Sequence, residues 1–215
     1  MTQPLHIAID GPAASGKTTV AHLLAQRFGI GFVDTGAMYR ALALLAIRRS
    51  IDPRDGPVLA QRVDDALAVA SQASEESLQS EDVTAIVSTV AAHAAVRAAM
   101  VAAQRRVAEG RALVMAGRDI GTVVLPDAPV KIYLTASVAA RVARRQAQLA
   151  RVGVQVDAAR LCDEIEARDR LDTTRAVSPL EPASDAHRID SSDLPVEGVV
   201  DEICAIVKRT VPSAG

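Results

Sequence analysis

A glycine-rich segment near the amino terminus restricts what this chain can fold into. The segment Gly-Pro-Ala-Ala-Ser-Gly-Lys-Thr, residues 11–18, follows the apolar run 5–9 and opens an amphipathic stretch that extends to residue 28. It fits the pattern GxxxxGK[ST] between a strand and a helix, where glycines let backbone N–H groups surround an anion at the positive end of the helix. We therefore expect ATP or GTP with Mg²⁺ here, with Lys17 on the β- and γ-phosphates and the Thr18 hydroxyl on the metal. The expected nucleotide-binding residues are Gly11, Pro12, Ala13, Ala14, Ser15, Gly16, Lys17, Thr18 and Thr19.

Apolar runs that alternate with helical patterns indicate the fold class. Strands that alternate with helices form a parallel sheet covered on both faces, and ligands bind at the carboxyl ends of the strands. The chain has 215 residues, which suits one domain with a full core. We expect one α/β domain over residues 1–215, a three-layer sandwich with a five-stranded parallel sheet. The predicted strands are 5–9, 30–33, 112–117, 130–136 and 187–190.

The region between the second and third predicted strands is harder to assign. Helical patterns cover 58–70 and 84–109, and the stretch 71–82 between them is polar and has no period, so we expect it to be an exposed excursion. After the fourth strand, two helical stretches over 137–150 and 158–169 are joined near Gly153.

Composition excludes several classes of partner. The net charge is −2, and aromatic residues make up 2% of the chain with no Trp, which argues against a polyanion binder and against base-stacking platforms for nucleic acid. No segment approaches the roughly 18 apolar residues of a membrane span, and the amino terminus lacks the pattern of a signal peptide. Two distant cysteines and four scattered histidines form neither a disulfide framework nor a metal cluster. We expect a cytoplasmic protein that acts on small molecules, without nucleic-acid or membrane partners.

Missing residues exclude two classes of nucleotide-binding protein. A guanine-reading switch needs an Asn-Lys-x-Asp loop and an Asp-x-x-Gly loop, but this chain contains no asparagine and no Asp three residues before a Gly. A motor ATPase usually has paired acids at the end of its sensing strand, whereas the run 112–117 ends in Ala-Gly. A small kinase remains.

Three Asp/Arg pairs indicate where a second substrate binds. They lie in 34–40, 117–122 and 168–175, at strand ends or a hinge. A single pair of this kind is more often a surface ion pair, but three at such positions suit a phosphate-bearing acceptor. A phosphate monoester is already dianionic near neutral pH, so its kinase needs arginine forks rather than a general base. These pairs are consistent with a nucleoside monophosphate acceptor, which composition does not name.

Four segments carry a resemblance to one family: IAIDGPAASGKTT (7–19), VDTGAMYRALAL (33–44), GRDIGTVVLPDAPVKIYLTAS (117–137) and EARDRLDTTRAVSPLEPASDAHRIDSS (166–192). In these segments the sequence resembles the bacterial cytidylate kinases, which phosphorylate CMP and dCMP with ATP. The resemblance covers nearly the whole chain and implies Mg·ATP as the phosphoryl donor and CMP or dCMP as the small-molecule substrate. It also implies a CMP-binding insert over about 58–97, shorter here than is usual, and a helical lid over about 141–172 that carries Arg144 and Arg145. We expect a monomer.

The resemblance assigns roles to individual residues. Thr35 would lie near the cytosine, Arg40 would bind the CMP phosphate, and Ser88 and Arg97 would belong to the sugar and base pocket. In the GRD segment, Arg118 would face phosphate and base and Asp119 the base; a carboxylate can accept from the exocyclic amine of cytosine. Arg168, Asp172 and Arg175 would contact ribose and phosphate. Together with the phosphate-loop pattern and the departure described below, the resemblance leads us to expect Lys17, Asp34, Arg118 and Arg175 in catalysis.

One departure from the family pattern leads to a specific expectation. The family usually has an acidic residue before GRD, whereas this chain has Ala116, and we expect Asp34 to take over its part in the magnesium shell. Two alternatives stay open. One is a kinase of a small hydroxylated metabolite with Asp34 as its base, and the other is a regulatory module that only senses ATP.

Overall fold

The computed structural model describes residues 4–151, 153–175 and 177–211, so position 152 of the expected lid lies outside the described residues. Two compact units make up the chain. The first combines residues 1–33 with 110–215, and the second consists of residues 34–109.

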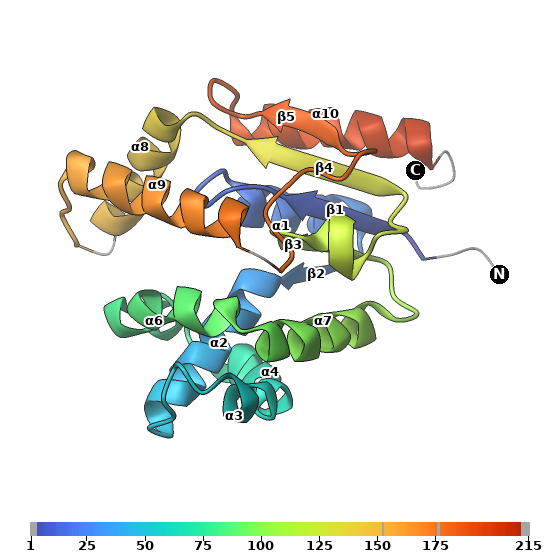
Figure 1. The fold of residues 1–215 in the computed structure, drawn as a ribbon. Coiled ribbons are helices and arrows are strands. Elements are labelled where there is room, and N and C mark those ends of the chain that lie inside the picture. Colours follow the sequence, from blue (N-terminus) through green and yellow to red (C-terminus); the bar gives the residue numbers. More distant parts are fainter. Residues whose placement is uncertain (1–3, 152, 176, 212–215) are drawn as a thin grey trace. The chain divides into compact units, whose positions relative to one another are not determined.

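The first unit is built on the expected five-stranded parallel sheet, in the order β2-β3-β1-β4-β5 (Figure 1). Central strand β1 pairs with β3 and β4, and β4 pairs with β5, all in parallel. The α/β prediction is therefore confirmed, because near-continuous apolar runs are what strands need when both faces are covered. The strands are β1 (His6–Asp10), β2 (Gly31–Asp34), β3 (Leu113–Gly117), β4 (Val130–Thr135) and β5 (His187–Asp190).

Two helices of the first unit pack against each other and against the sheet (Figure 1). They are α1 (Lys17–Phe28), which ends at Gly29 in the left-handed conformation, and α10 (Val196–Thr210). Leu24 and Ile203 are fully buried in this core, and burial of such a side chain contributes about 1.5–3 kcal/mol. The core fixes the strand ends and the start of α1.

The expected lid region forms a helix pair, α8 (Val138–Arg151) and α9 (Ala158–Thr174). A small apolar cluster of Val142, Leu161 and Ile165 joins the two helices. Asp157 caps α9 by accepting from the N–H of Arg160 at 3.1 Å.

The second unit is helical over residues 35–109. Leu42, Leu59 and Met100 are fully buried in its core. Its helices are α2 (Thr35–Arg48), α3 (Gly56–Ala60), α4 (Val63–Gln72), α5 (Glu75–Leu78), α6 (Glu81–Ala92) and α7 (Ala94–Ala108).

Three secondary-structure expectations for this unit were wrong in part. The predicted helix 58–70 is broken between α3 and α4, and the predicted helix 84–109 is two helices bent by 95° at His93. The stretch 71–82 contains the end of α4, the short α5 and the start of α6. Ser74 and Ser80 explain the last error, because their hydroxyls accept the N–H groups of Ser77 and Val83 and start new helices.

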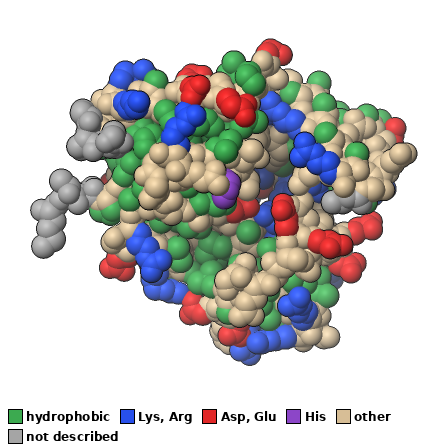
Figure 2. All heavy atoms as spheres, turned by 180° about the vertical axis from the view of Figure 1, so that it is seen from behind, with side chains coloured by type: hydrophobic (Ala, Val, Ile, Leu, Met, Phe, Trp, Pro, Cys, Tyr) green, Lys and Arg blue, Asp and Glu red, His purple; other side chains and the backbone are tan. Residues whose placement is uncertain are grey.

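Basic and acidic side chains are interspersed on the face drawn in Figure 2, in keeping with the small net charge. Within the described ranges, no single helix is long and apolar enough to span a membrane. Helices α6 and α7 pass that test of length and composition only when taken together across their bend.

Candidate active site

The loop after β1 has the conformation that its glycines predict. Gly11 has φ 150°, and a Cβ there would lie 2.0 Å from the carbonyl oxygen of Leu134 on β4, so any side chain would collide with the neighbouring strand. Gly16 has φ 92°, in the left-handed region that favours glycine. These two positions let the loop turn tightly into the first turn of α1.

Lys17 lies over this loop. It is 7% exposed, and its Nζ donates to the carbonyl oxygen of Pro12 at 2.6 Å and to Ser15 Oγ at 3.4 Å. The first turn of α1 contains no acidic residue and no side-chain cap, so its N–H groups and its dipole suit an anion. Thr18 and Thr19 follow on the solvent-exposed side of that turn. This arrangement can hold a polyphosphate.

Two arginines of α8 contact the loop. Arg144 donates to the carbonyl oxygen of Ser15 at 3.4 Å and to Ser191 Oγ at 3.0 Å. Arg141, which is 4% exposed, donates to the carbonyl oxygen of Ala13 at 3.4 Å and pairs with Asp169 of α9 at 2.6 Å. The sequence had suggested Arg144 but not Arg141. Arg145 instead donates to Gln148 on the same helix, at 2.8 Å.

Asp172 contacts two of the arginines that we expect near the substrate phosphate. Arg118 Nε donates to its Oδ2 at 2.8 Å, and Arg175 Nη1 lies 3.7 Å from its Oδ1. Burial raises the pKa of the Asp172 carboxyl, but the charges of Arg118, Arg168 and Arg175 outweigh burial, and the pKa lies below its usual value. The structure thus brings together the GRD segment after β3 and the carboxyl-terminal half of α9.

Asp119 lies beside this cluster in the chain and is 6% exposed. Near it is a carboxylate that the sequence reading did not single out, Asp10 at the end of β1, which accepts from the N–H groups of Ile120 and Gly121. Burial and the negative charge of Asp119 raise the pKa of Asp10 to about 6, against the lowering effect of the two N–H groups and Lys17. The sequence feature that could have pointed to Asp10 is its position directly before the glycine-rich loop.

In the second unit, Asp34 and Arg40 form an ion pair at the start of α2. Arg40 Nη2 donates to Asp34 Oδ2 at 3.0 Å, and both side chains are about one-fifth exposed (23% and 19%). A Cβ on Gly36 would lie 3.0 Å from both Arg40 Nη1 and Asp34 Oδ1, so the glycine gives this pair room. Thr35 is 4% exposed beside them.

Arg97 is buried on α7 in the same unit, 2% exposed, with its guanidinium carbon 5.8 Å from the centre of the Tyr39 ring. This distance suits a cation–π contact, and the sequence reading had given Tyr39 no role. Ser88, expected in the same pocket as Arg97, lies on the exposed side of α6.

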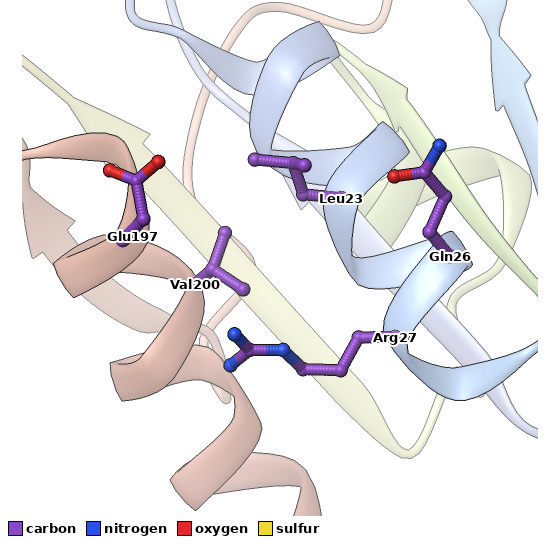
Figure 3. A pocket seen from close by; sticks show the side chains of 5 residues that line it. All are labelled: Leu23, Gln26, Arg27, Glu197 and Val200. Carbon is purple, nitrogen blue, oxygen red and sulfur yellow. The ribbon is translucent and has the colours of Figure 1, made fainter.

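A groove of about 340 Å³ lies between α1 and α10 in the first unit (Figure 3). Arg27 points from α1 toward α10 there and pairs with Asp201, both of them largely exposed. The groove borders the carboxyl-terminal half of α1, whereas the phosphate loop precedes this helix, so we assign it no part in the site. Its lining residues are Leu23, Gln26, Arg27, Glu197 and Val200.

Among the described residues, no group of three or more His, Cys, Asp or Glu side chains could hold a metal ion by itself. Cys162 and Cys204 are free thiols.

Comparison with known proteins identifies the family. Residues 7–209 match the sequence model of the family described as cytidylate kinase. The chain belongs to the cytidylate kinase family. It is 50% identical over 216 residues to the cytidylate kinase of Pelotomaculum thermopropionicum, covering 94% of this chain and 95% of that protein. It is 45% identical to the cytidylate kinase of Enterococcus faecalis, covering 95% and 96% of the two chains.

Solved structures support the fold. A gluconokinase from Sinorhizobium meliloti matches with a TM-score of 0.50 at 15% identity, over 98% of this chain and 95% of that chain. A protein from Eubacterium ventriosum matches with a TM-score of 0.54 at 15% identity, over 95% and 98%. Membership of the cytidylate kinase family makes the chain a phosphotransferase that uses ATP as donor and a nucleotide as substrate.

Proposed function

We propose that the protein transfers the γ-phosphoryl group of ATP to CMP and dCMP, giving CDP and dCDP. The observation that carries this proposal is the cluster of Arg118 and Arg175 on Asp172, in a chain of this family that also has a phosphate loop. Such a cluster offers oriented guanidinium groups to a second phosphate, which neither an ATP sensor nor a motor requires.

ATP, the phosphoryl donor, would bind at the loop 11–19. The backbone N–H groups of this loop and Lys17 would hold the phosphates of ATP, and the hydroxyl of Thr18, an exposed residue in the first turn of α1, would hold Mg²⁺. Mg²⁺ would neutralise charge on the phosphates. Arg141 and Arg144 tie α8 to the same loop, so closing of the α8–α9 pair would exclude water and suppress ATP hydrolysis.

On the acceptor side, a phosphate oxygen of CMP would attack the γ-phosphorus in line. This oxygen is already ionised near neutral pH, so no general base is needed. We propose that Arg40, Arg118 and Arg175 hold the CMP phosphate, and that Thr35, Ser88, Arg97, Arg168 and Asp172 contribute to base and ribose binding.

Asp119 would select cytosine. A buried carboxylate can accept from the exocyclic amine, whereas uracil presents an oxygen there and would leave two acceptors facing each other. An unsatisfied buried group costs about 1–3 kcal/mol, which is sufficient for roughly 5- to 150-fold discrimination.

The role of Asp34 distinguishes the proposal from a metabolite kinase. Its carboxylate pairs with Arg40, which favours a part in holding that arginine over one as the base of a hydroxyl acceptor. Its expected contribution to the magnesium shell stays a prediction.

The test is ADP release at fixed Mg·ATP with CMP, dCMP, UMP, AMP, GMP or no acceptor. We expect fast turnover with CMP and dCMP alone. Transfer to small alcohols with little to CMP would favour the metabolite kinase, and ATP binding without acceptor-dependent turnover would favour a sensor. We also propose a monomeric cytoplasmic enzyme without nucleic-acid or membrane partners, which gel filtration and cell fractionation can check.

A further inference from the structure

Asp10 is the last residue of β1 and is 4% exposed. Each of its carboxylate oxygens accepts one backbone N–H: Oδ1 from Ile120 and Oδ2 from Gly121, both at 2.7 Å. These distances are short for N–H···O bonds and typical of hydrogen bonds to an ionised acceptor.

The two N–H groups belong to a short π-helical turn, η1 (Ile120–Val124), that directly follows Arg118 and Asp119. Asp119 occupies the N-cap position of η1, where aspartate commonly accepts from the first N–H groups, but its side chain makes no such bond. Asp10, more than a hundred residues away in the chain, performs this capping instead.

Gly121 makes this contact possible. A Cβ at this position would lie 3.2 Å from Lys131 Cδ, a tight contact, and 3.4 Å from Asp10 Oδ2, so a side chain larger than alanine would crowd the carboxylate. Because Asp10 is bonded directly to Gly11, the same contact joins the GRD segment to the start of the phosphate loop.

A buried negative charge at this point is unfavourable by itself. Asp119 faces Asp10 with like charge, Tyr133 lies next to it on β4, and Lys17 provides opposite charge. An apolar or amide side chain would avoid the cost of desolvation, so packing alone does not explain why a carboxylate stands here.

We propose that Asp10 is a positioning residue for acceptor recognition: its carboxylate fixes the turn after β3 and thereby the placement of Arg118 and Asp119 against the nucleoside monophosphate. This inference rests on the proposed function. Asp10 itself touches neither ATP nor acceptor in this scheme. Its removal should therefore weaken acceptor binding and base selection while ATP binding persists.

The test is Asp10→Asn, which keeps the shape but turns an NH₂ donor toward one of the two N–H groups. We expect the KM for CMP to rise about tenfold, as for the loss of one charged hydrogen bond, and the ratio of kcat/KM for CMP to that for UMP to fall by a similar factor. The KM for ATP should change less than twofold. If Asp10 served stability alone, the variant would have a lower melting temperature but wild-type KM values for both CMP and ATP.

Asp190→Asn is the matched control. Asp190 ends β5 and accepts the N–H of Ser192 at 2.9 Å, and the proposed substrate site does not include it. Its variant should show wild-type KM values for CMP and ATP.

Gly121→Val keeps the carboxylate but adds methyl groups beyond a Cβ that already lies 3.4 Å from Asp10 Oδ2, and it should give the same KM split if Asp10→Asn does not fold. A larger rise in the KM for ATP than for CMP, or unchanged KM values for both, would overturn the proposal.

A readout without turnover separates this inference from the proposed function. If the wild-type enzyme transfers no phosphate to CMP, the proposed function fails. The inference is then judged by hydrogen exchange of the Ile120 and Gly121 amides. These amides should exchange at least about tenfold faster in Asp10→Asn than in wild type, with the β3 amides unchanged. Equal exchange in both proteins would show that the carboxylate does not hold the turn.

Discussion

Arg118 and Asp172 are 54 residues apart in the chain, yet Nε of the arginine donates to Oδ2 of the aspartate at 2.8 Å. The pair joins the loop after β3 to the end of α9. Both side chains are largely buried, 20% and 17% exposed, so their interaction is less screened than that of a surface ion pair. Arg175 shares the same carboxylate. The positions of both arginines therefore depend on the Asp172 carboxylate.

Replacing Asp172 with Ala should release both arginines and leave their charges repelling each other. We expect the KM for CMP to rise about 10- to 100-fold and the free energy of unfolding to fall by about 1–3 kcal/mol. Steady-state kinetics and urea unfolding measure these changes. Glu164→Ala is the control, because Glu164 pairs with Arg160 on the exposed side of α9 and should change either quantity little.

Gly36→Ala tests the ion pair at the start of α2. Alanine is the better helix former by about 1 kcal/mol, yet its Cβ would lie 3.0 Å from both Arg40 and Asp34. We therefore expect the KM for CMP to rise several-fold without a matching loss of stability. The combination of unchanged kinetics and a raised melting temperature would contradict a substrate role for this pair.

Gly198→Ala supplies the comparison. Gly198 lies in α10, and the nearest atoms to an added Cβ, in the Pro195 ring, are 3.5 Å away, an ordinary contact. This variant should gain about 0.5–1 kcal/mol of stability and keep wild-type kinetics.

The sequence predicted the sheet well because β1 to β4 are largely apolar runs, whereas β5, with the sequence HRID, buries only Ile189. Strand ends in the structure lie within one or two residues of the predicted ones. Residues 71–82 were assigned less well, since the apolar periodicity is weak there and the helix starts depend on single hydroxyls such as Ser74 and Ser80.

The Asp34–Arg40 ion pair was predictable from a local pattern, whereas contacts between distant segments were not. The pattern DTGAMYR contains both partners of the Asp34–Arg40 ion pair, so their spacing in the sequence was sufficient to predict the contact. Nothing in the spacing of Asp10 and Gly121 shows that they touch, because only the order of the strands places β1 beside the turn after β3. The fold, rather than local sequence, creates that contact.

Asp34→Ala tests the expected replacement for the acid missing at Ala116. If Asp34 contributes to the magnesium shell, the Mg²⁺ concentration for half-maximal rate should rise by about tenfold in the variant. Titration of activity with Mg²⁺ at saturating CMP measures this shift. An unchanged magnesium dependence would overturn the metal role, and a raised KM for CMP alone would limit Asp34 to holding Arg40.

The buried Asp10 also predicts how stability varies with pH. Burial raises the pKa of Asp10 from its usual value of 3.8 to about 6, so the unfolded chain releases this proton at lower pH than the native protein does. Protonated Asp10 contributes stability that is fully present below about pH 4 and is lost as the pH rises through about 6. The shift of roughly two units corresponds to about 3 kcal/mol.

Asp10→Asn removes this titration. The difference in unfolding free energy, variant minus wild type, should therefore rise by up to about 3 kcal/mol between pH 4 and pH 7, as measured by urea unfolding at one-unit intervals. Asp190→Asn should show little change over this range, because hydrogen bonds from Ser192 hold the pKa of Asp190 below its usual value of 3.8, so its titration lies below pH 4. A difference for Asp10→Asn that is constant over this range would mean that Asp10 is not a costly buried charge. Its use in place of a neutral side chain would then need no functional reason.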